Sequence, residues 1–264
     1  MRDTLEQSVR LLEQTKGAEL ELVRSAKASD IVVVEGEHDN IENILDALEV
    51  PHTMVNYVGD ATRKNPNVIF VNCKQYGSFS EDAVKRYVKD GGRIVTTDWA
   101  LSVFTKSFPG YVKRGKEDIP DSRLGISAAN YLGVRLMGTK FVSKKPKWFF
   151  ESASYTVFNE KKEGKEIISL LVSQELQGKY DTNLVAFGIK SGKGEAIHFT
   201  SHLDAQEAGS KSEGIATDYS TAHAVLMLCT KMPVLWDPSN PNADLTKSIM
   251  LRPNIGGEKS KALI

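Results

Sequence analysis

IVVVEG, at residues 31–36, is a continuous run of apolar, β-branched side chains that ends at a glycine. A strand with one face in water alternates polar and apolar residues, and this run does not alternate. The pattern predicts a strand buried on both faces, which is typical of a parallel sheet covered by helices. The apolar residues that follow recur at helical spacing and predict a helix: Ile41, Ile44, Leu45 and Leu48.

Similar apolar runs recur along the chain and predict further strands. They lie at 53–58, 68–73, 93–99, 167–175, 183–192 and 195–200, and a closing helix is predicted at 218–231. The segment SEDAVKRYVKDGG predicts a helix that begins after Ser80 and stops at Gly91 and Gly92. Strands that alternate with helices over short connections favour an α/β domain with a mainly parallel sheet and right-handed crossovers.

This pattern divides the chain into three parts. Residues 1–29 form an N-terminal helical extension, in which apolar residues recur at roughly helical spacing among charges. Residues 30–231 form the α/β domain, with an insertion at about 105–165 that is rich in glycine, lysine and proline, and residues 232–264 form an extended C-terminal tail. The N-terminal helix either lies on the surface of its own domain or serves self-association or a partner protein.

The composition argues against several classes of protein. The 34 basic and 34 acidic residues give a formal net charge of zero, so no overall field attracts nucleic acid or an acidic membrane. No apolar run approaches the roughly 18 residues of a transmembrane helix, and the N-terminus lacks the apolar core of a signal peptide. Cys73 and Cys229 lie in or beside apolar segments, which suits reduced thiols. We therefore expect a cytoplasmic protein without a membrane span.

The most basic stretch of the chain precedes three aromatic residues. It contains Lys140, Lys144, Lys145 and Lys147, followed by Trp148, Phe149 and Phe150. Lysines beside aromatic rings can bind nucleic-acid phosphates and bases. A buried strand or turn with solvated lysines on its flank explains the pattern better, and no phosphate-binding glycine motif follows a strand. We expect a protein partner or self-association, no nucleic acid and no cofactor.

Polar side chains follow the predicted strands at the point where each strand ends. In an open parallel sheet, ligands bind outside the carboxyl ends of the strands, so these side chains are expected to gather at one edge. They are Glu35, Glu37 and His38 after the first strand, Cys73 after the third, Asp98 after the fourth, and His202, Asp204 and Gln206 after the strand at 195–200. If the last two strands are close, Asp98 and His202 should lie within hydrogen-bonding or one-water distance.

Two of these segments resemble the class I glutamine amidotransferase-like superfamily, over roughly residues 30–231. VKDGGRIVTTDWAL (88–101) resembles the nucleophile-elbow region, and GKGEAIHFTSHLDAQ (192–206) resembles the strand that delivers the catalytic histidine and acid as His-x-Glu. His202 and Asp204 match that spacing with aspartate for glutamate, and the cysteine position falls at about Asp98. The resemblance implies a flavodoxin-like, mainly parallel sheet with helices on both faces. The chain is also similar to non-catalytic branches of the superfamily, such as ThuA-like and trimerisation domains.

The nucleophile of the amidotransferases is missing from its expected place. Their chemistry needs a thiolate that forms an acyl-enzyme, and Asp98 cannot play that role in amide hydrolysis. Cys73 ends a different strand and is not followed by an elbow of small residues, so it is interpreted as structural, and Cys229 as part of the core. The hypothesis that follows is a non-enzymatic, amidotransferase-like module that acts by binding, in assembly or regulation.

A hydrolase or metal-dependent enzyme is the alternative. Hard cations take oxygen ligands and histidine suits zinc or iron, so the residues at the edge could form a metal or hydrolytic site. The candidates are Glu35, Glu37, His38, Asp98, His202 and Asp204. They show no established metal-binding spacing, and a third interpretation is that they are hydrogen-bonded polar residues that cap strand ends. The sequence leaves these alternatives open.

Overall fold

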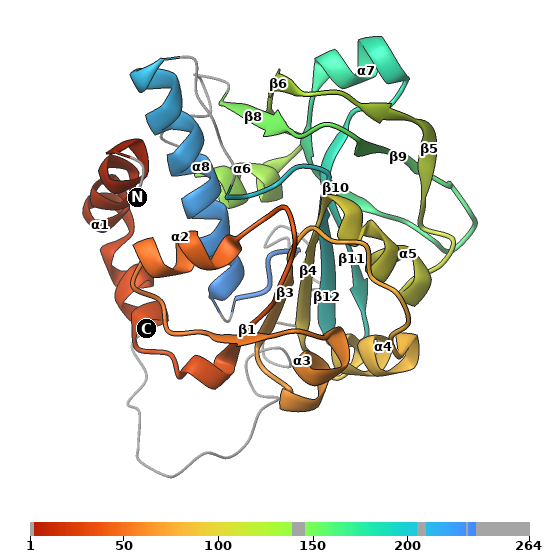
Figure 1. The fold of residues 1–264 in the computed structure, drawn as a ribbon, viewed down its shortest axis with the longest axis horizontal. Helices are drawn as coiled ribbons and strands as arrows, with labels where there is room; N and C mark the ends of the chain where they lie inside the picture. The colour runs from red at the N-terminus through yellow and green to blue at the C-terminus, as the bar shows by residue number, and fades with distance from the viewer. Residues whose placement is uncertain (1–2, 139–145, 205–209, 231, 236–264) are drawn as a thin grey trace.

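The computed structural model describes residues 3–138, 146–204, 210–230 and 232–235. In this part of the chain the centre is an eight-stranded sheet in the order β2-β1-β3-β4-β12-β11-β10-β7 (Figure 1). The strands are β1 (Ile31–Val34), β2 (Thr53–Val55), β3 (Val68–Val71), β4 (Arg93–Thr97), β7 (Ser127–Ala128), β10 (Ile168–Val172), β11 (Leu184–Ser191) and β12 (Gly194–Phe199). The first five in spatial order run parallel, and β11, β10 and β7 add an antiparallel side.

The parallel half has the strand order of flavodoxin-like sheets, with β12 in the fifth place. The predicted fold class, a mainly parallel α/β sheet of this kind, is therefore correct. The order also determines where a functional site can form, because β3, β4 and β12 are neighbours and end at the same edge.

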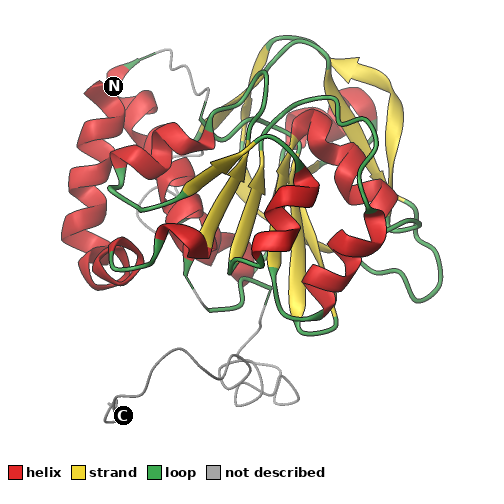
Figure 2. Ribbon diagram, turned by 60° about the horizontal axis from the view of Figure 1, so that its bottom comes forward, coloured by secondary structure: helices red, strands yellow, loops and turns green. Residues whose placement is uncertain are grey.

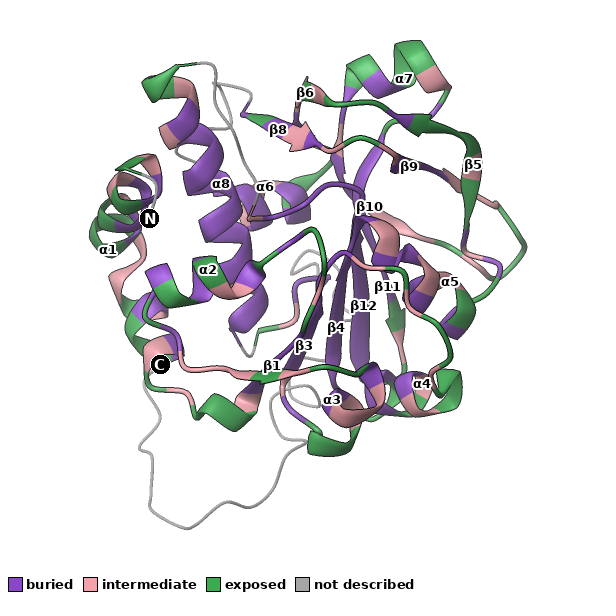
Figure 3. Ribbon diagram, viewed as in Figure 1, coloured by how far each residue is buried: buried purple, intermediate pink, exposed green. Residues whose placement is uncertain are grey.

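Helices cover both faces of the sheet (Figure 2). One face carries α1 (Asp3–Arg24), α2 (Ile41–Ala47), α6 (Tyr131–Met137) and α8 (Lys211–Cys229), and the other carries α3 (Val58–Lys64), α4 (Glu81–Lys89) and α5 (Leu101–Ser107). All four residues of β1 are buried, two against each set of helices, because side chains alternate along a strand. Figure 3 shows the central strands buried along their length.

The N-terminal helix α1 packs along α8 of its own chain. Its apolar side chains Leu5, Val9, Leu12, Leu20 and Val23 are buried in the same core as α8 and α2, and the helix is kinked at Lys16. The apolar stripe that these five side chains form is therefore covered by the chain itself, so the idea that it serves self-association or a partner is wrong.

Several elements differ in extent from their predicted ranges. β2 ends at Val55, and the helix α3 begins at Val58, where a strand was expected to end. β4 ends at Thr97 and is followed by the short 3-10 helix Asp98–Ala100, so 93–99 is not all strand. β10 is shorter than 167–175, because α7 (Gln174–Tyr180) begins there. The closing helix α8 begins at Lys211, seven residues earlier than expected.

The inserted segment contains two small two-stranded sheets. They pair β5 (Val112–Ile119) with β9 (Ser154–Asn159), and β6 (Ser122–Gly125) with β8 (Lys147–Phe150). Trp148 and Phe150 of β8 are buried and Lys147 is exposed, which agrees with a buried strand that has a solvated flank. The lysines at 140, 144 and 145 lie outside the described residues.

A buried ion pair holds the end of α8 and the chain after it. Arg93 Nε lies 3.0 Å from Glu195 Oε2, and its guanidinium also donates to the carbonyls of Leu228, Thr230 and Met232. Glu195 in turn accepts from the amides of residues 234 and 235. The first residues of the predicted tail are thus fixed, while 236–264 lie outside the described residues. Among the helices that the structure describes, none has the length and apolar character needed to cross a membrane.

Candidate functional site

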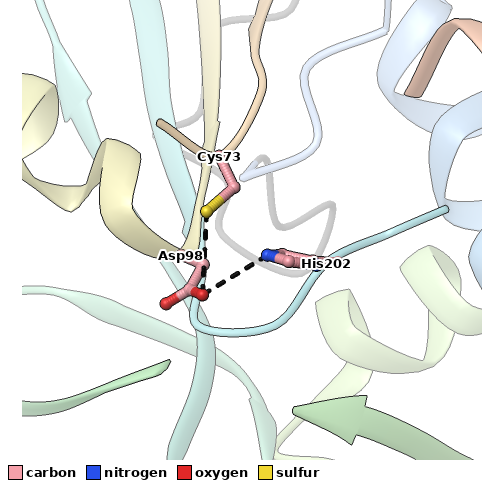
Figure 4. Close-up of side chains that lie close together, drawn as sticks. All are labelled: Cys73, Asp98 and His202. Atoms are coloured by element: carbon pink, nitrogen blue, oxygen red, sulfur yellow. Dashed lines mark hydrogen bonds and ion pairs between the residues drawn. The ribbon is translucent and has the colours of Figure 1, made fainter. Parts of the chain in front are cut away.

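Three buried side chains with different chemistry meet at the carboxyl edge of the parallel strands (Figure 4). Cys73 follows β3, Asp98 directly follows β4, and His202 lies in the loop after β12. Cys73 and His202 are fully buried and Asp98 is 2% exposed. The Cys73 sulfur, an Asp98 carboxylate oxygen and an imidazole nitrogen of His202 all lie within 4.8 Å of one another.

Asp98 occupies a sharp turn between strand β4 and helix α5. Its backbone has φ of +40°, in the left-handed region that few residues other than glycine, asparagine and aspartate adopt. The carboxylate Oδ2 accepts from Ser154 Oγ at 2.9 Å and from Cys73 Sγ at 3.8 Å, and Oδ1 accepts from the Tyr155 amide at 3.2 Å. These donors fix the position of the carboxylate.

His202 lies between two carboxylates. Its Nε2 is 3.4 Å from Asp98 Oδ2, as the positions of the two strands predict, and its Nδ1 is 3.5 Å from Glu151 Oε2. Burial lowers the pKa of His202, but the hydrogen bond to Asp98 and the charges of Asp39, Asp98 and Glu151 outweigh it, so the pKa is raised. The neighbouring carboxylates therefore favour the charged form of the imidazole.

The loop that carries His202 is held in place by the buried carboxylate of Asp39, which lies in the loop after β1. Asp39 is fully buried and accepts from the amides of Leu203 and Asp204 at 3.3 and 3.1 Å. The backbone after β1 thereby orients the backbone after β12, which sets the position of the imidazole.

The Cys73 thiol is in an environment that opposes ionisation. Burial raises the pKa of Cys73 strongly, and the negative charge of Asp98 raises it further. The thiol therefore stays protonated near neutral pH and donates to Asp98. The carbonyl of Cys73 accepts from the amides of Glu37 and His38 at 2.9 and 3.2 Å, which ties the loops after β1 and β3 together.

The remaining predicted residues lie around this centre. Glu35, Glu37 and His38 are exposed, and Glu37 lies 3.6 Å from the Lys74 ammonium. Asp204 is partly buried and accepts from Asn43 at 3.0 Å, and the acid that faces His202 Nδ1 is Glu151. Gln206 lies outside the described residues.

Glu151 and Ser154 are site residues that the sequence did not point to. Both belong to the inserted segment, next to the start of β9, where no regular pattern predicts a strand end. The apolar run WFF at 148–150 is the available signal, because it predicts a buried strand and Glu151 follows the end of that strand.

An aromatic row borders the centre on its outer side. The Trp99 ring stacks on Tyr155 with centroids 6.2 Å apart, and His38 meets Trp99 edge-on at 4.9 Å. The Arg114 guanidinium lies 3.6 Å from the centre of the Tyr155 ring. Arg114 and Tyr155 also line a surface pocket of about 450 Å³ beside the turn that carries Asp98.

Comparisons with known proteins give similarity at the level of structure only. No family model matches the sequence, and no curated protein matches it. A glutamine amidotransferase from Methylobacillus flagellatus is 10% identical with a TM-score of 0.48, over 77% of this chain and 94% of that one. A glutamine amidotransferase from Thermotoga maritima is 8% identical with a TM-score of 0.44, over 75% of this chain and 94% of that one.

A β-galactosidase from Bacillus circulans is 15% identical with a TM-score of 0.49, over 81% of this chain but 33% of that one. The chain thus spans about a third of that β-galactosidase and nearly the full length of the two amidotransferases. No activity follows from likenesses this distant, and the fold class rests on this chain's own strand order.

Proposed function

We propose that this chain is an amidotransferase-like module that acts by binding, in assembly or regulation, and that it does not hydrolyse glutamine. The observation that carries the proposal is the shared oxygen of Asp98. The Cys73 thiol and the His202 imidazole both face Oδ2, so the carboxylate engages both the sulfur of the centre and the base that would have to activate it.

Glutaminase chemistry requires a thiolate beside a base that can accept its proton. Here the neighbouring carboxylate stabilises the protonated thiol, and the imidazole is engaged by Asp98 and Glu151. A negative charge next to a thiol disfavours the thiolate by the same physics that makes a nearby cation favour it. The arrangement of charges is therefore the reverse of an activated cysteine.

A hydrolase that uses Asp98 itself is the second candidate, and one observation favours it. His202 contacts Asp98 on one side and Glu151 on the other, as a base contacts a nucleophile and the acid that orients it. Asp98 also lies in a left-handed turn between a strand and a helix. Against it, both carboxylate oxygens already accept hydrogen bonds and the residue is 2% exposed. Hydrolysis of a panel of activated esters, lost in Asp98→Asn and kept in Cys73→Ala, would favour this candidate.

The main proposal is tested with an electrophilic analogue of glutamine that alkylates activated cysteines. Intact-mass spectrometry should show no adduct after incubation at neutral pH, and ammonia release from glutamine should stay at the level of a buffer blank. A stoichiometric adduct that Cys73→Ala abolishes and Cys229→Ala retains would overturn the proposal. An active glutaminase treated in parallel shows that the reagent works.

The expected partner, another protein or a second copy, must use a surface other than the stripe of α1. The strand β2 is at the edge of the sheet, and Met54 on it and Tyr57 just after it are exposed. Native mass spectrometry of wild type and of Met54→Lys tests this surface, and an unchanged assembly in the variant would count against it. The cytoplasmic location expected from the two free cysteines stays a prediction.

A further inference from the structure

We propose that Cys73, Asp98 and His202 bind a single zinc ion. This inference goes beyond the proposed binding role and does not rest on it. The centre offers one sulfur, one carboxylate oxygen and one imidazole nitrogen. Zinc is bound by these three donor types, whereas calcium and magnesium prefer oxygen alone.

The spacing of the donor atoms agrees with a tetrahedral ion. Bonds of about 2.0–2.1 Å to nitrogen, 2.0–2.2 Å to oxygen and 2.3 Å to sulfur give edges of roughly 3.4 Å for N···O and 3.6 Å for S···O. The observed distances from Asp98 Oδ2 are 3.4 Å to His202 Nε2 and 3.8 Å to Cys73 Sγ. The third pair, sulfur and nitrogen, lies within 4.8 Å, whereas a tetrahedral ion requires about 3.5 Å, so these two side chains must move closer together when the ion binds.

The groups behind the donors are those that orient metal ligands. A ligating histidine usually donates its second N–H to a carboxylate, which fixes the tautomer, and Glu151 Oε2 faces His202 Nδ1 at 3.5 Å. Ser154 Oγ and the Tyr155 amide hold the Asp98 carboxylate. The arrangement therefore leaves His202 Nε2 directed at the shared position, together with the sulfur and the carboxylate.

Metal binding would be coupled to proton release, because zinc takes cysteine as the thiolate and histidine through a neutral ring nitrogen. A tetrahedral ion held by these three side chains would take one further ligand, such as water.

The test uses the full chain, freed of metal by dialysis against a chelator and then titrated with cobalt(II) and with zinc. We expect one equivalent of cobalt to give the visible bands of a tetrahedral ion and a sulfur-to-cobalt charge-transfer band in the near ultraviolet. One equivalent of zinc should displace it. Cys73→Ser should lose the charge-transfer band, and the matched control Cys229→Ser should keep it. Glu151→Gln should weaken zinc binding about 10- to 100-fold.

Wild-type protein that gives no charge-transfer band would overturn the proposal without recourse to any variant. It would also be overturned by a band that persists in Cys73→Ser, or by binding that is abolished in His38→Gln, which would indicate an adventitious ion on the exposed histidine. Circular dichroism of each variant confirms that it is folded before its spectrum is compared.

Discussion

Replacement of Asp98 should destabilise the metal-free protein through two separable effects. In Asp98→Ala, the Ser154 hydroxyl, the Tyr155 amide and the His202 ring all lose their shared acceptor inside a buried site. Removing one partner of a buried, hydrogen-bonded pair costs about 3–5 kcal/mol. Alanine must also adopt φ near +40°, which adds roughly 1 kcal/mol.

Two matched variants separate these effects. Asp98→Gly also removes the carboxylate but tolerates the left-handed backbone, so it should be about 1 kcal/mol more stable than Asp98→Ala. Asp98→Asn keeps a hydrogen-bond acceptor and tolerates the left-handed backbone, but it removes the negative charge. It should therefore lose the least unfolding free energy of the three variants. It should also lower the pKa of His202, because the largest factor that raises it is gone.

The assay is urea unfolding at pH 7, with the free energy of unfolding and its dependence on urea fitted for each variant. NMR titration of the His202 ring in wild type and Asp98→Asn gives the second measurement. If all three variants stay within about 0.5 kcal/mol of wild type, which is the range of ordinary surface substitutions, Asp98 does not anchor the site. Identical titration curves would show that Asp98 and His202 do not interact.

Three further predictions concern the core of the fold. Burial lowers the pKa of His198 to about 3 and that of His223 to about 4, so both stay neutral in the fold while the unfolded chain takes up protons below about 6.5. The free energy of unfolding that these two neutral histidines contribute is complete above that pH and falls by about 2 kcal/mol for each histidine at pH 5. Unfolding of His223→Gln, measured at pH 7 and at pH 5, should therefore lack the part of this pH dependence that His223 contributes. Glu195→Gln should weaken the buried ion pair, and hydrogen exchange should then speed up at the two amides that follow α8. Leu12→Asp should unfold the protein at a lower temperature without changing its mass in solution, whereas Leu22→Asp, at a 60% exposed position of the same helix, should change neither.

The central strands could be predicted because their sequences satisfy a simple physical requirement. A strand covered on both faces must be apolar throughout, and 31–34 and 68–71 have that composition. The rule that parallel strands deliver their following residues to one edge then placed Asp98 near His202. Strand ends were predicted too long because the residues after them, such as Asp98, begin a turn that local composition does not mark.

The inserted part of the site was beyond reach of sequence patterns. Glu151 and Ser154 come to the centre because β9 pairs with β5, which is more than thirty residues away in the chain. The helix α3 was missed for a related reason, since only Val58 and Ala61 of its seven residues are buried, too few to give a helical period. Elements stabilised by distant contacts leave little local signal.

The ion pair of Arg93 and Glu195 has a mechanical consequence. It joins the end of α8 to the beginning of two adjacent central strands, β4 and β12. A pulling force applied at residue 235 would reach Glu195 through two backbone amides, and the load would pass into the middle of the sheet and not into the helix alone. Pulling the described end of the chain away would therefore require breaking contacts with the central strands β4 and β12, and not only with α8.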